Sequence, residues 1–127
     1  MKVYLPIITK NEFDTATKSH VFETGERAFD FDFSLACQLR FEAKFPAQAQ
    51  KETIVDYVKR VSEYPHSVAT LLSKLKAVYC FIAGEDLTFE GFVRLFDFTR
   101  KSFVEALTAR FKEIFDLFES EAAEKNS

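Results

Sequence analysis

The sequence of 127 residues contains many acidic side chains, but no spacing pairs a nucleophile with a base. The two histidines, His20 and His66, fall in different expected elements, and no Ser–His–Asp or Cys–His order accompanies them. Catalysis needs a nucleophile or base that neighbouring groups hold in place. We therefore expect surface or capping roles for both histidines, no catalytic residue, no cofactor and no enzyme activity.

A group of carboxylates near residue 30 has the ligand chemistry of a hard cation. Asp30 and Asp32 lie two residues apart, with Glu23 and Glu26 upstream, and carboxylate oxygens are the ligands that divalent cations such as Ca²⁺ prefer. The two aspartates also alternate with phenylalanines, which is the pattern of a strand with one buried and one solvated face. We favour the solvated face and predict no metal site.

Basic residues in the last third of the chain could bind phosphate groups. They are Arg94, Arg100, Lys101, Arg110 and Lys112. Acidic residues are interleaved with them, the formal net charge is −3, and the isoelectric point is about 5.4. This balance is typical of a solvated face of mixed charge, and it gives no electrostatic reason to bind nucleic acid.

The composition is that of one folded domain. Hydrophobic residues make up 47% of the chain and charged residues 29%, as in globular proteins. Only three glycines and three prolines indicate long regular elements with few loops. We expect residues 1–127 to form a single domain.

Three observations favour a reducing cytosol as the location. Cys37 and Cys80 are too few for a disulfide framework and have apolar neighbours, so we expect reduced, buried thiols. The longest apolar run, Ala77–Ala83, is far shorter than the roughly 18 residues of a membrane span. The N-terminal stretch lacks the apolar core and cleavage site of a signal peptide.

The elements that would position these residues begin with a hairpin. Lys2–Thr9 is β-branched and contains Pro6, which predicts an edge strand or extended arm, and polar Lys10–Ser19 predicts a loop. His20–Thr24 and Arg27–Phe33 flank Gly25-Glu26, a dipeptide that suits a tight hairpin turn. We expect residues 1–33 to form this arm and hairpin.

After residue 33 the apolar residues recur at helical spacing, which predicts a bundle of four or five helices over residues 34–119. The first expected helix is Leu35–Lys44, which Asp32 or Ser34 caps and Pro46 ends. The second covers about Ala49–Glu63, and the third is His66–Ala83, with Gly84 at its C-cap. The last expected segment is Thr88–Ser120, which Thr88 caps and which is either continuous or broken near Phe98–Ser102. The acidic residues 120–127 are expected to be a disordered tail. The fold class is therefore α+β and mostly α, and the core should include Leu75, Val78, Tyr79 and Ile82.

We expect the sixteen phenylalanines to exceed what a domain of this size can bury, which predicts an apolar surface patch. Phe111, Phe115 and Phe118 lie at i, i+4 and i+7, so their rings share one helix face. We expect these three residues to form a partner-binding or self-association surface. The alternative is that the same rings fill the monomer core.

Several motifs resemble those of the tail assembly chaperones of long-tailed bacteriophages (siphophages). They are Arg40-Phe41-Glu42 followed by Phe45-Pro46, Asp56-Tyr57-Val58, the helix Leu75–Phe81, and Phe92–Asp97. The resemblance begins in Phe31–Pro46 and covers roughly Val21–Phe98. Phe41 stands where many relatives are expected to carry a tryptophan.

The resemblance implies a non-enzymatic role. Such chaperones bind the tape-measure protein during tail assembly, with the tail-tube protein as a second candidate partner. They act in the cytoplasm of the infected or lysogenic bacterial host and leave before the virion is complete. The alternative function is a homo-oligomeric helical adaptor or regulatory protein with a phenylalanine-rich self-association face, and the third is a small enzyme.

Overall fold

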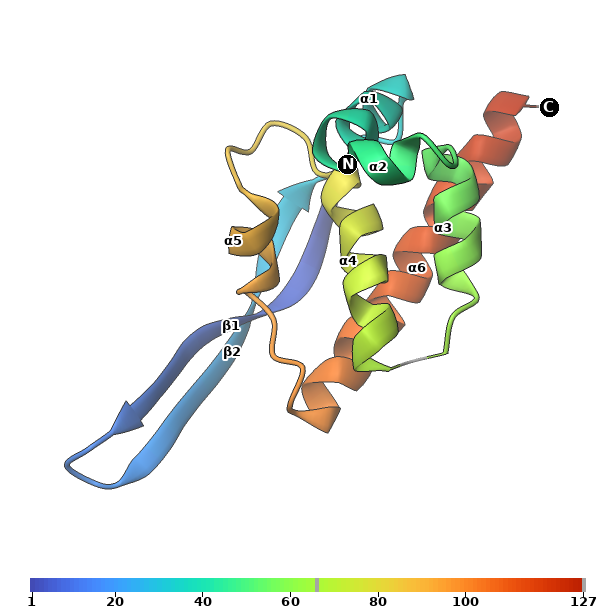
Figure 1. Cartoon of the computed structure of the whole chain (residues 1–127). Coiled ribbons are helices and arrows are strands. Elements are labelled where there is room, and N and C mark those ends of the chain that lie inside the picture. The colour runs from blue at the N-terminus through green and yellow to red at the C-terminus, as the bar shows by residue number, and fades with distance from the viewer. Residues whose placement is uncertain (66, 127) are drawn as a thin grey trace.

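The computed structural model describes residues 1–65 and 67–126, which form a two-stranded hairpin followed by helices (Figure 1). The α+β class expected from the sequence is confirmed. The elements are β1 Lys2–Asp14, β2 Ser19–Asp30, α1 Leu35–Lys44, α2 Pro46–Ala49, α3 Ile54–Ser62, α4 Val68–Phe81, α5 Phe89–Val93 and α6 Lys101–Asn126. The described residues thus contain six helical segments rather than four or five, because α2 and α5 are separate short helices of four and five residues.

The hairpin is longer than expected, and its turn lies elsewhere. β1 and β2 pair antiparallel from Lys2 opposite Asp30 to Asp14 opposite Ser19. The predicted turn at Gly25-Glu26 is wrong, because Gly25 lies inside β2 opposite Ile7. The predicted loop over residues 10–19 is also wrong for residues 10–14, which belong to β1, and for Ser19, where β2 begins.

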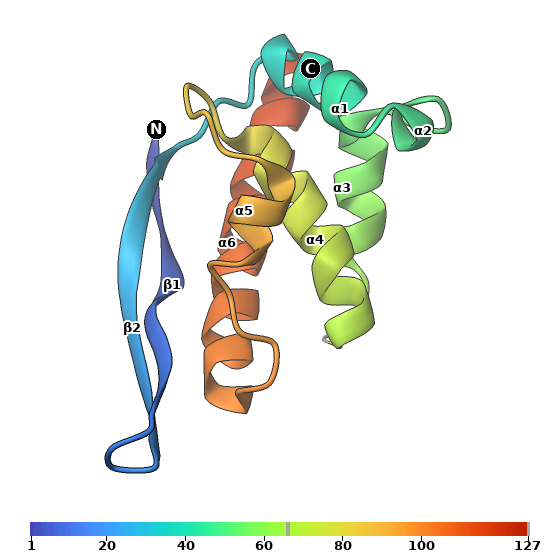
Figure 2. The ribbon, with the colours of Figure 1, turned by 60° about the vertical axis from the view of Figure 1, so that its left-hand side comes forward.

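Side-chain hydrogen bonds explain the position of the turn. The Asp14 carboxylate accepts hydrogen bonds from the backbone N–H groups of Ala16 and Thr17, and Lys18 has a positive φ of 55°. An aspartate that bonds to the backbone two residues ahead makes a tight turn without glycine. In Figures 1 and 2 this turn lies at the free end of the hairpin, beyond the helices.

Caps set most of the helix starts. The Ser34 side chain accepts a hydrogen bond from Ala36 N–H, which confirms the expected helix Leu35–Lys44 and selects Ser34 rather than Asp32 as its cap. Thr53, Ser67 and Thr88 cap α3, α4 and α5 in the same way. Each cap satisfies backbone donors that the first helical turn leaves open.

Four helix boundaries differ from the expectation. The second long helix begins at Ile54 rather than near Ala49, since Thr53 is its cap. α4 is Val68–Phe81, its C-cap is Ile82 rather than Gly84, and His66 lies outside the described residues. The segment expected over 88–120 takes the broken alternative, with α5 ending at Val93 and α6 beginning at Lys101, and α6 extends to Asn126 through most of the tail expected to be disordered.

The core lies around α4 and the inner face of α6. Leu75, Val78, Tyr79 and Ile82 are all at most 7% exposed, which confirms the core expected from the sequence. Ten of the sixteen phenylalanines are buried, and five more are partly buried against that core: Phe22, Phe33, Phe45, Phe89 and Phe98. Phe13, near the hairpin turn, is 59% exposed, so the expected phenylalanine surface patch is not present.

The helices and the hairpin meet at a shared junction. Phe31 forms an isolated bridge with Ile82, and Asp32 N–H donates to the carbonyl oxygen of Phe81 at 2.8 Å. Figure 2 shows the hairpin standing beside α6, while α1 and α2 lie across one end of α3, α4 and α6. No helix among the described residues is long and apolar enough to cross a membrane.

Candidate functional site

The three residues expected to bind a partner lie inside the monomer. Phe111, Phe115 and Phe118 are 1%, 3% and 3% exposed. The Phe118 ring stacks on the Phe81 ring with centroids 4.7 Å apart, and the Phe115 ring lies 6.4 Å from the same ring. Their helix face packs against α4, so the core alternative describes them and they do not form an open docking face.

The residues considered for catalysis and metal binding are not brought together. His20 is exposed on the hairpin and hydrogen-bonds to Asn11, and His66 is outside the described residues. Asp30 is exposed, while Asp32 accepts hydrogen bonds from Ser34 and Arg40. Within residues 1–65 and 67–126, no group of three or more His, Cys, Asp or Glu side chains is arranged to hold a metal ion.

Four of the five basic residues considered for phosphate binding form ion pairs with nearby carboxylates, and the fifth, Lys112, lines a polar cavity together with Asp116. Ion pairs join Arg94 to Glu90, Arg100 to Asp97, Lys101 to Glu105, and Arg110 to both Glu26 and Glu113. A phosphate would have to compete with these carboxylates for the same cations. The described side chains therefore form the mixed-charge face expected from the sequence.

Among the described residues, the strongest candidate for binding another molecule is an apolar groove between α1, α3 and the C-terminal half of α6. Its volume is about 590 Å³. It is lined by Phe33, Ser34, Leu35, Cys37, Gln38, Glu42, Thr53, Ile54, Val55, Asp56, Phe118 and Ala122. In Figures 1 and 2 these elements come together at the end of the molecule where α1 lies and where the C-terminus emerges.

The first wall of the apolar groove is α1, which has apolar residues on two faces. Cys37 and Phe41 face the core and are at most 1% exposed. Leu35 and Leu39 lie one turn apart on the other side and are 87% and 65% exposed. Leu35 lines the groove, and Leu39 extends its apolar surface along α1 because residues at i and i+4 share a helix face.

The second wall is the first turn of α3. Gln38 on α1 accepts a hydrogen bond from Ile54 N–H at 2.8 Å, so this side chain joins the two walls and fixes their separation. Val55 lines the groove and is 38% exposed, whereas Ile54 is buried. Tyr57 O–H donates to the carbonyl oxygen of Ser73 at 2.9 Å, which holds α3 against α4.

Aromatic rings form the floor of the groove. The Phe33 ring lies 5.0 Å from Phe81 and 5.4 Å from Phe118, both edge to face. Edge-to-face pairs at such distances are favourable and hold rings in fixed orientations. Phe118 is thus the one residue of the expected partner-binding set that reaches the groove, as part of its buried floor.

The charged residues that line the apolar groove are both acidic. Glu42 lies on the α1 wall and Asp56 on the α3 wall, and both are exposed. The Gln38 side-chain amide donates to Glu42 at 3.4 Å. The groove therefore combines an apolar interior with one exposed negative charge on each of two walls.

A second cavity, of about 310 Å³, is polar and lies between α4 and α6. Its lining includes Lys74, Thr108, Lys112 and Asp116. Lys74 is 3% exposed and its ammonium group donates to the carbonyl oxygen of Tyr64 at 3.1 Å. Burial lowers the pKa of this lysine. Charges of both signs meet here without an open apolar surface, so the cavity is a weaker candidate for partner binding.

Comparison with known protein families, characterised proteins and solved structures finds no match for this chain. Its function is therefore inferred from its own residues. The signal for the groove was present in the sequence as Leu35 and Leu39, one turn apart on a helix whose opposite face carries Cys37 and Phe41. The opposing wall, from α3, depends on how the helices cross and has no local signal.

Proposed function

We propose that this protein is a tail assembly chaperone of the siphophage type, which binds an apolar helical segment of the tape-measure protein in the apolar groove. The observation that carries the proposal is the uncovered apolar surface of Leu35, Leu39 and Val55 beside a groove of about 590 Å³. Exposed apolar surface of this kind usually marks a partner site on a folded protein.

The dimensions of the groove suit one row of side chains from a helix. A volume of about 590 Å³ admits several apolar side chains but not a whole helix. A partner helix would lie across α1 and α3 and insert residues spaced at i, i+3 or i+4, and i+7. This mode of binding would cover the apolar stripe of a long helix and keep it from aggregating.

The resemblance to the tail assembly chaperones also points to α1 as part of the binding site. The run Phe31–Pro46, in which the resemblance begins, forms α1 and its flanks and so supplies one wall of the groove. On this proposal the chain acts in the cytoplasm of the phage-infected or lysogenic bacterium, performs no catalysis and is absent from the finished virion. The tail-tube protein remains a second candidate partner.

The alternative function, an oligomeric adaptor joined through a phenylalanine-rich face, loses its main support. Phe111, Phe115 and Phe118 are buried, and Phe13 is the exposed phenylalanine of the described residues. A self-association face of that composition would first require the core to open.

Co-expression with the tape-measure protein of the same phage tests the proposal. The wild-type chain should raise the soluble fraction of the tape-measure protein and form a complex whose mass is measured by light scattering. The double variant Leu35→Asp, Leu39→Asp should lose both effects. Leu72→Asp is the matched control, because Leu72 is 42% exposed but does not line the groove. Equal rescue by the groove variant and the wild type would contradict the proposal.

A further inference from the structure

The two carboxylates of the apolar groove are available to a cationic partner, unlike several other acidic side chains of this protein that already bind an arginine. Glu26, Glu52, Glu85, Glu90 and Asp97 each form an ion pair with an arginine. Among the described residues, neither Glu42 nor Asp56 forms an ion pair, and no lysine or arginine lines the groove. Among the described residues, the negative charge on each wall is therefore not held in an ion pair.

We infer that the apolar groove selects amphipathic helices whose apolar stripe is bordered by lysine or arginine on both sides. This inference rests on the proposed function, because it specifies the chemistry of the helix that the groove binds. With Leu35 and Val55 contacting the stripe, Glu42 on the α1 wall and Asp56 on the α3 wall are the carboxylates available to the flanking residues of a bound helix. A basic flank meets a carboxylate on either side, whereas an acidic flank meets two like charges.

The partial charges of the helix ends at the groove do not reverse the preference for a helix with basic flanks. The N-termini of α1 and α3 also face the groove, and helix N-termini carry partial positive charge. Ser34 and Thr53 cap them with side-chain hydrogen bonds, and Asp56 lies in the first turn of α3. Two full negative charges at exposed edges therefore dominate the field that an approaching helix meets.

Exposed charge pairs contribute modestly to affinity but strongly to discrimination. Pairs of this kind are each worth a few-fold in affinity, and like charges placed together suppress the wrong partner. Two such pairs predict a preference of about tenfold for a basic-flanked over an acidic-flanked helix at low salt. The preference should shrink at high salt because ions screen exposed charges.

The probes for the test are two synthetic helical peptides with the same leucine stripe. One carries lysine and the other glutamate at the positions that border the stripe. Fluorescence anisotropy gives the dissociation constant of each peptide at about 50 mM and 500 mM sodium chloride. The variants are Glu42→Lys with Asp56→Lys at the groove edges, Leu35→Asp in the groove, and Glu12→Lys, which changes an exposed carboxylate on the hairpin as a charge-matched control.

The wild type and Glu12→Lys should prefer the lysine-flanked peptide about tenfold at low salt, and the edge variant should prefer the glutamate-flanked one. Equal binding of both peptides by the wild type, abolished by Leu35→Asp, would overturn the charge preference while leaving groove binding intact. Binding that survives Leu35→Asp, or no binding of either peptide, would overturn groove binding as well. Sedimentation of each protein alone identifies the remaining occupant: a wild-type dimer that Leu35→Asp makes monomeric would assign the groove to a second copy and overturn the inference.

Discussion

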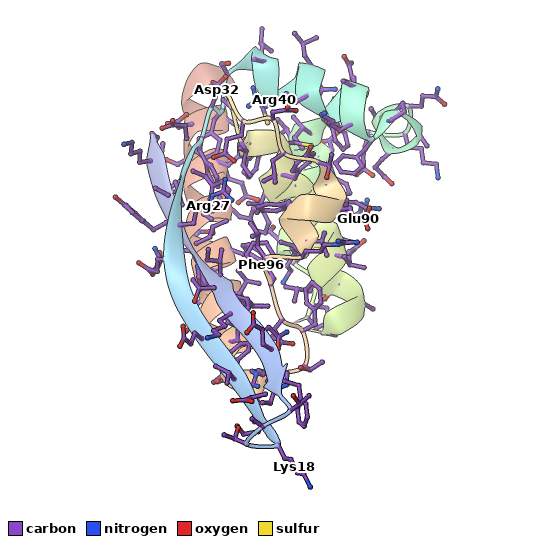
Figure 3. All side chains as sticks on the ribbon, turned by 90° about the vertical axis from the view of Figure 1, so that its left-hand side faces the viewer. Lys18, Arg27, Asp32, Arg40, Glu90 and Phe96 are labelled. Carbon is purple, nitrogen blue, oxygen red and sulfur yellow. The ribbon has the colours of Figure 1, made fainter. Side chains whose placement is uncertain are left out.

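Arg40 joins three parts of the chain through one guanidinium group. Its Nε donates to the carbonyl oxygen of Cys80 at 2.7 Å, and Nη2 donates to the carbonyl oxygens of Asp32 at 2.8 Å and Phe81 at 3.3 Å. Nη1 lies 3.4 Å from the Asp32 carboxylate. These bonds satisfy the last carbonyls of α4 and attach α1 to the exit of the hairpin, and Figure 3 shows Asp32 and Arg40 next to each other at that junction.

Replacing Arg40 should therefore destabilise the whole domain. Arg40→Met removes the donors for partly buried carbonyl oxygens, and hydrogen bonds to charged groups are each worth about 1.5–3 kcal/mol. We expect the free energy of unfolding to fall by about 2–4 kcal/mol in urea titrations. Arg40→Lys should recover less than half, because a lysine cannot reach several carbonyls in a planar fork. A loss below about 0.5 kcal/mol for Arg40→Met would show that the junction does not depend on this residue.

Three carboxylates make the free energy of unfolding depend on pH in the acidic range. Hydrogen bonds from the Ser34 backbone lower the pKa of Asp32, the Arg60 guanidinium lowers the pKa of Glu52, and bonds from Thr99 lower the pKa of Asp97. In each case the folded pKa lies below the unfolded value, so the folded state binds fewer protons in acid. Their stabilising contribution is present above the ordinary carboxyl pKa values and is lost as pH falls through the lower folded values.

The contribution of these groups to the free energy of unfolding should thus be nearly constant between about pH 7 and 5. It should decrease when the pH drops below about 4. Glu52→Gln should lower stability at pH 7 and make the decline in acid shallower, since the neutral side chain has no proton to gain. Urea midpoints measured from pH 7 to 3 check this. Glu12→Gln, an exposed position on the hairpin, is the control, and parallel curves for Glu52→Gln and the wild type would contradict the assignment.

At the scale of elements, α6 is a core helix. Its inner face carries Phe103, Leu107, Phe111, Ile114, Phe115 and Phe118, each at most 6% exposed. A helix that is buried along one face draws its stability from that packing rather than from intrinsic propensity. Loss of a ring from this face should therefore affect the whole fold.

Phe115→Ala should lower the free energy of unfolding by about 3–5 kcal/mol, the usual cost of removing a buried ring. Phe13→Ala is the matched control, because Phe13 is 59% exposed near the hairpin turn and its loss should cost less than about 0.5 kcal/mol. Thermal and urea unfolding of dilute protein measure both. Similar small losses for the two variants would mean that α6 is not packed as described.

Local signals predicted some elements well. Ser34 and Pro46 bracket α1, and both boundaries expected from the sequence are present. The hairpin turn was misplaced because Gly25-Glu26 carries the stronger local turn signal, whereas the turn used by the chain depends on Asp14 bonding to the backbone and on Lys18 accepting a positive φ. The sixteen phenylalanines suggested surplus apolar surface, but packing between the elements, with edge-to-face ring pairs among its contacts, buries ten of them.

The groove could not be derived from local pattern for a different reason. The exposed Leu35 and Leu39 are visible as a helical i, i+4 pair, but their binding surface exists only where α1 crosses the start of α3 and the end of α6. Crossing geometry depends on which side chains interdigitate between helices. The periodicity of one helix does not specify it.

At the scale of the whole molecule, the apolar groove is the place where three distant parts of the chain meet. α1 begins at residue 35, α3 at residue 54, and the part of α6 that lines the groove lies near residues 118–122. A helix bound across all three would connect them, and it could not bind the unfolded chain in the same way. Binding should therefore raise the stability of the entire domain.

The size of this stabilisation follows from mass action. At a peptide concentration one hundred times the dissociation constant, the free energy of unfolding should rise by about 2.7 kcal/mol. The lysine-flanked peptide should shift the urea midpoint of the wild type accordingly and leave that of Leu35→Asp unchanged. Cys37 provides a second readout, because it lines the groove while Cys80 does not, and both thiols are buried.

Thiol labelling in the single-cysteine variants Cys80→Ala and Cys37→Ala separates local from global effects. If α1 opens locally before the domain unfolds, bound peptide should slow the labelling of Cys37 more than that of Cys80. Burial raises the pKa of the Cys80 thiol, so the comparison uses each variant with and without peptide rather than the two cysteines directly. Equal slowing would mean that the domain opens as one cooperative unit. No slowing at a saturating peptide concentration would show that the peptide does not stabilise the folded state, and so does not bridge the three walls of the groove.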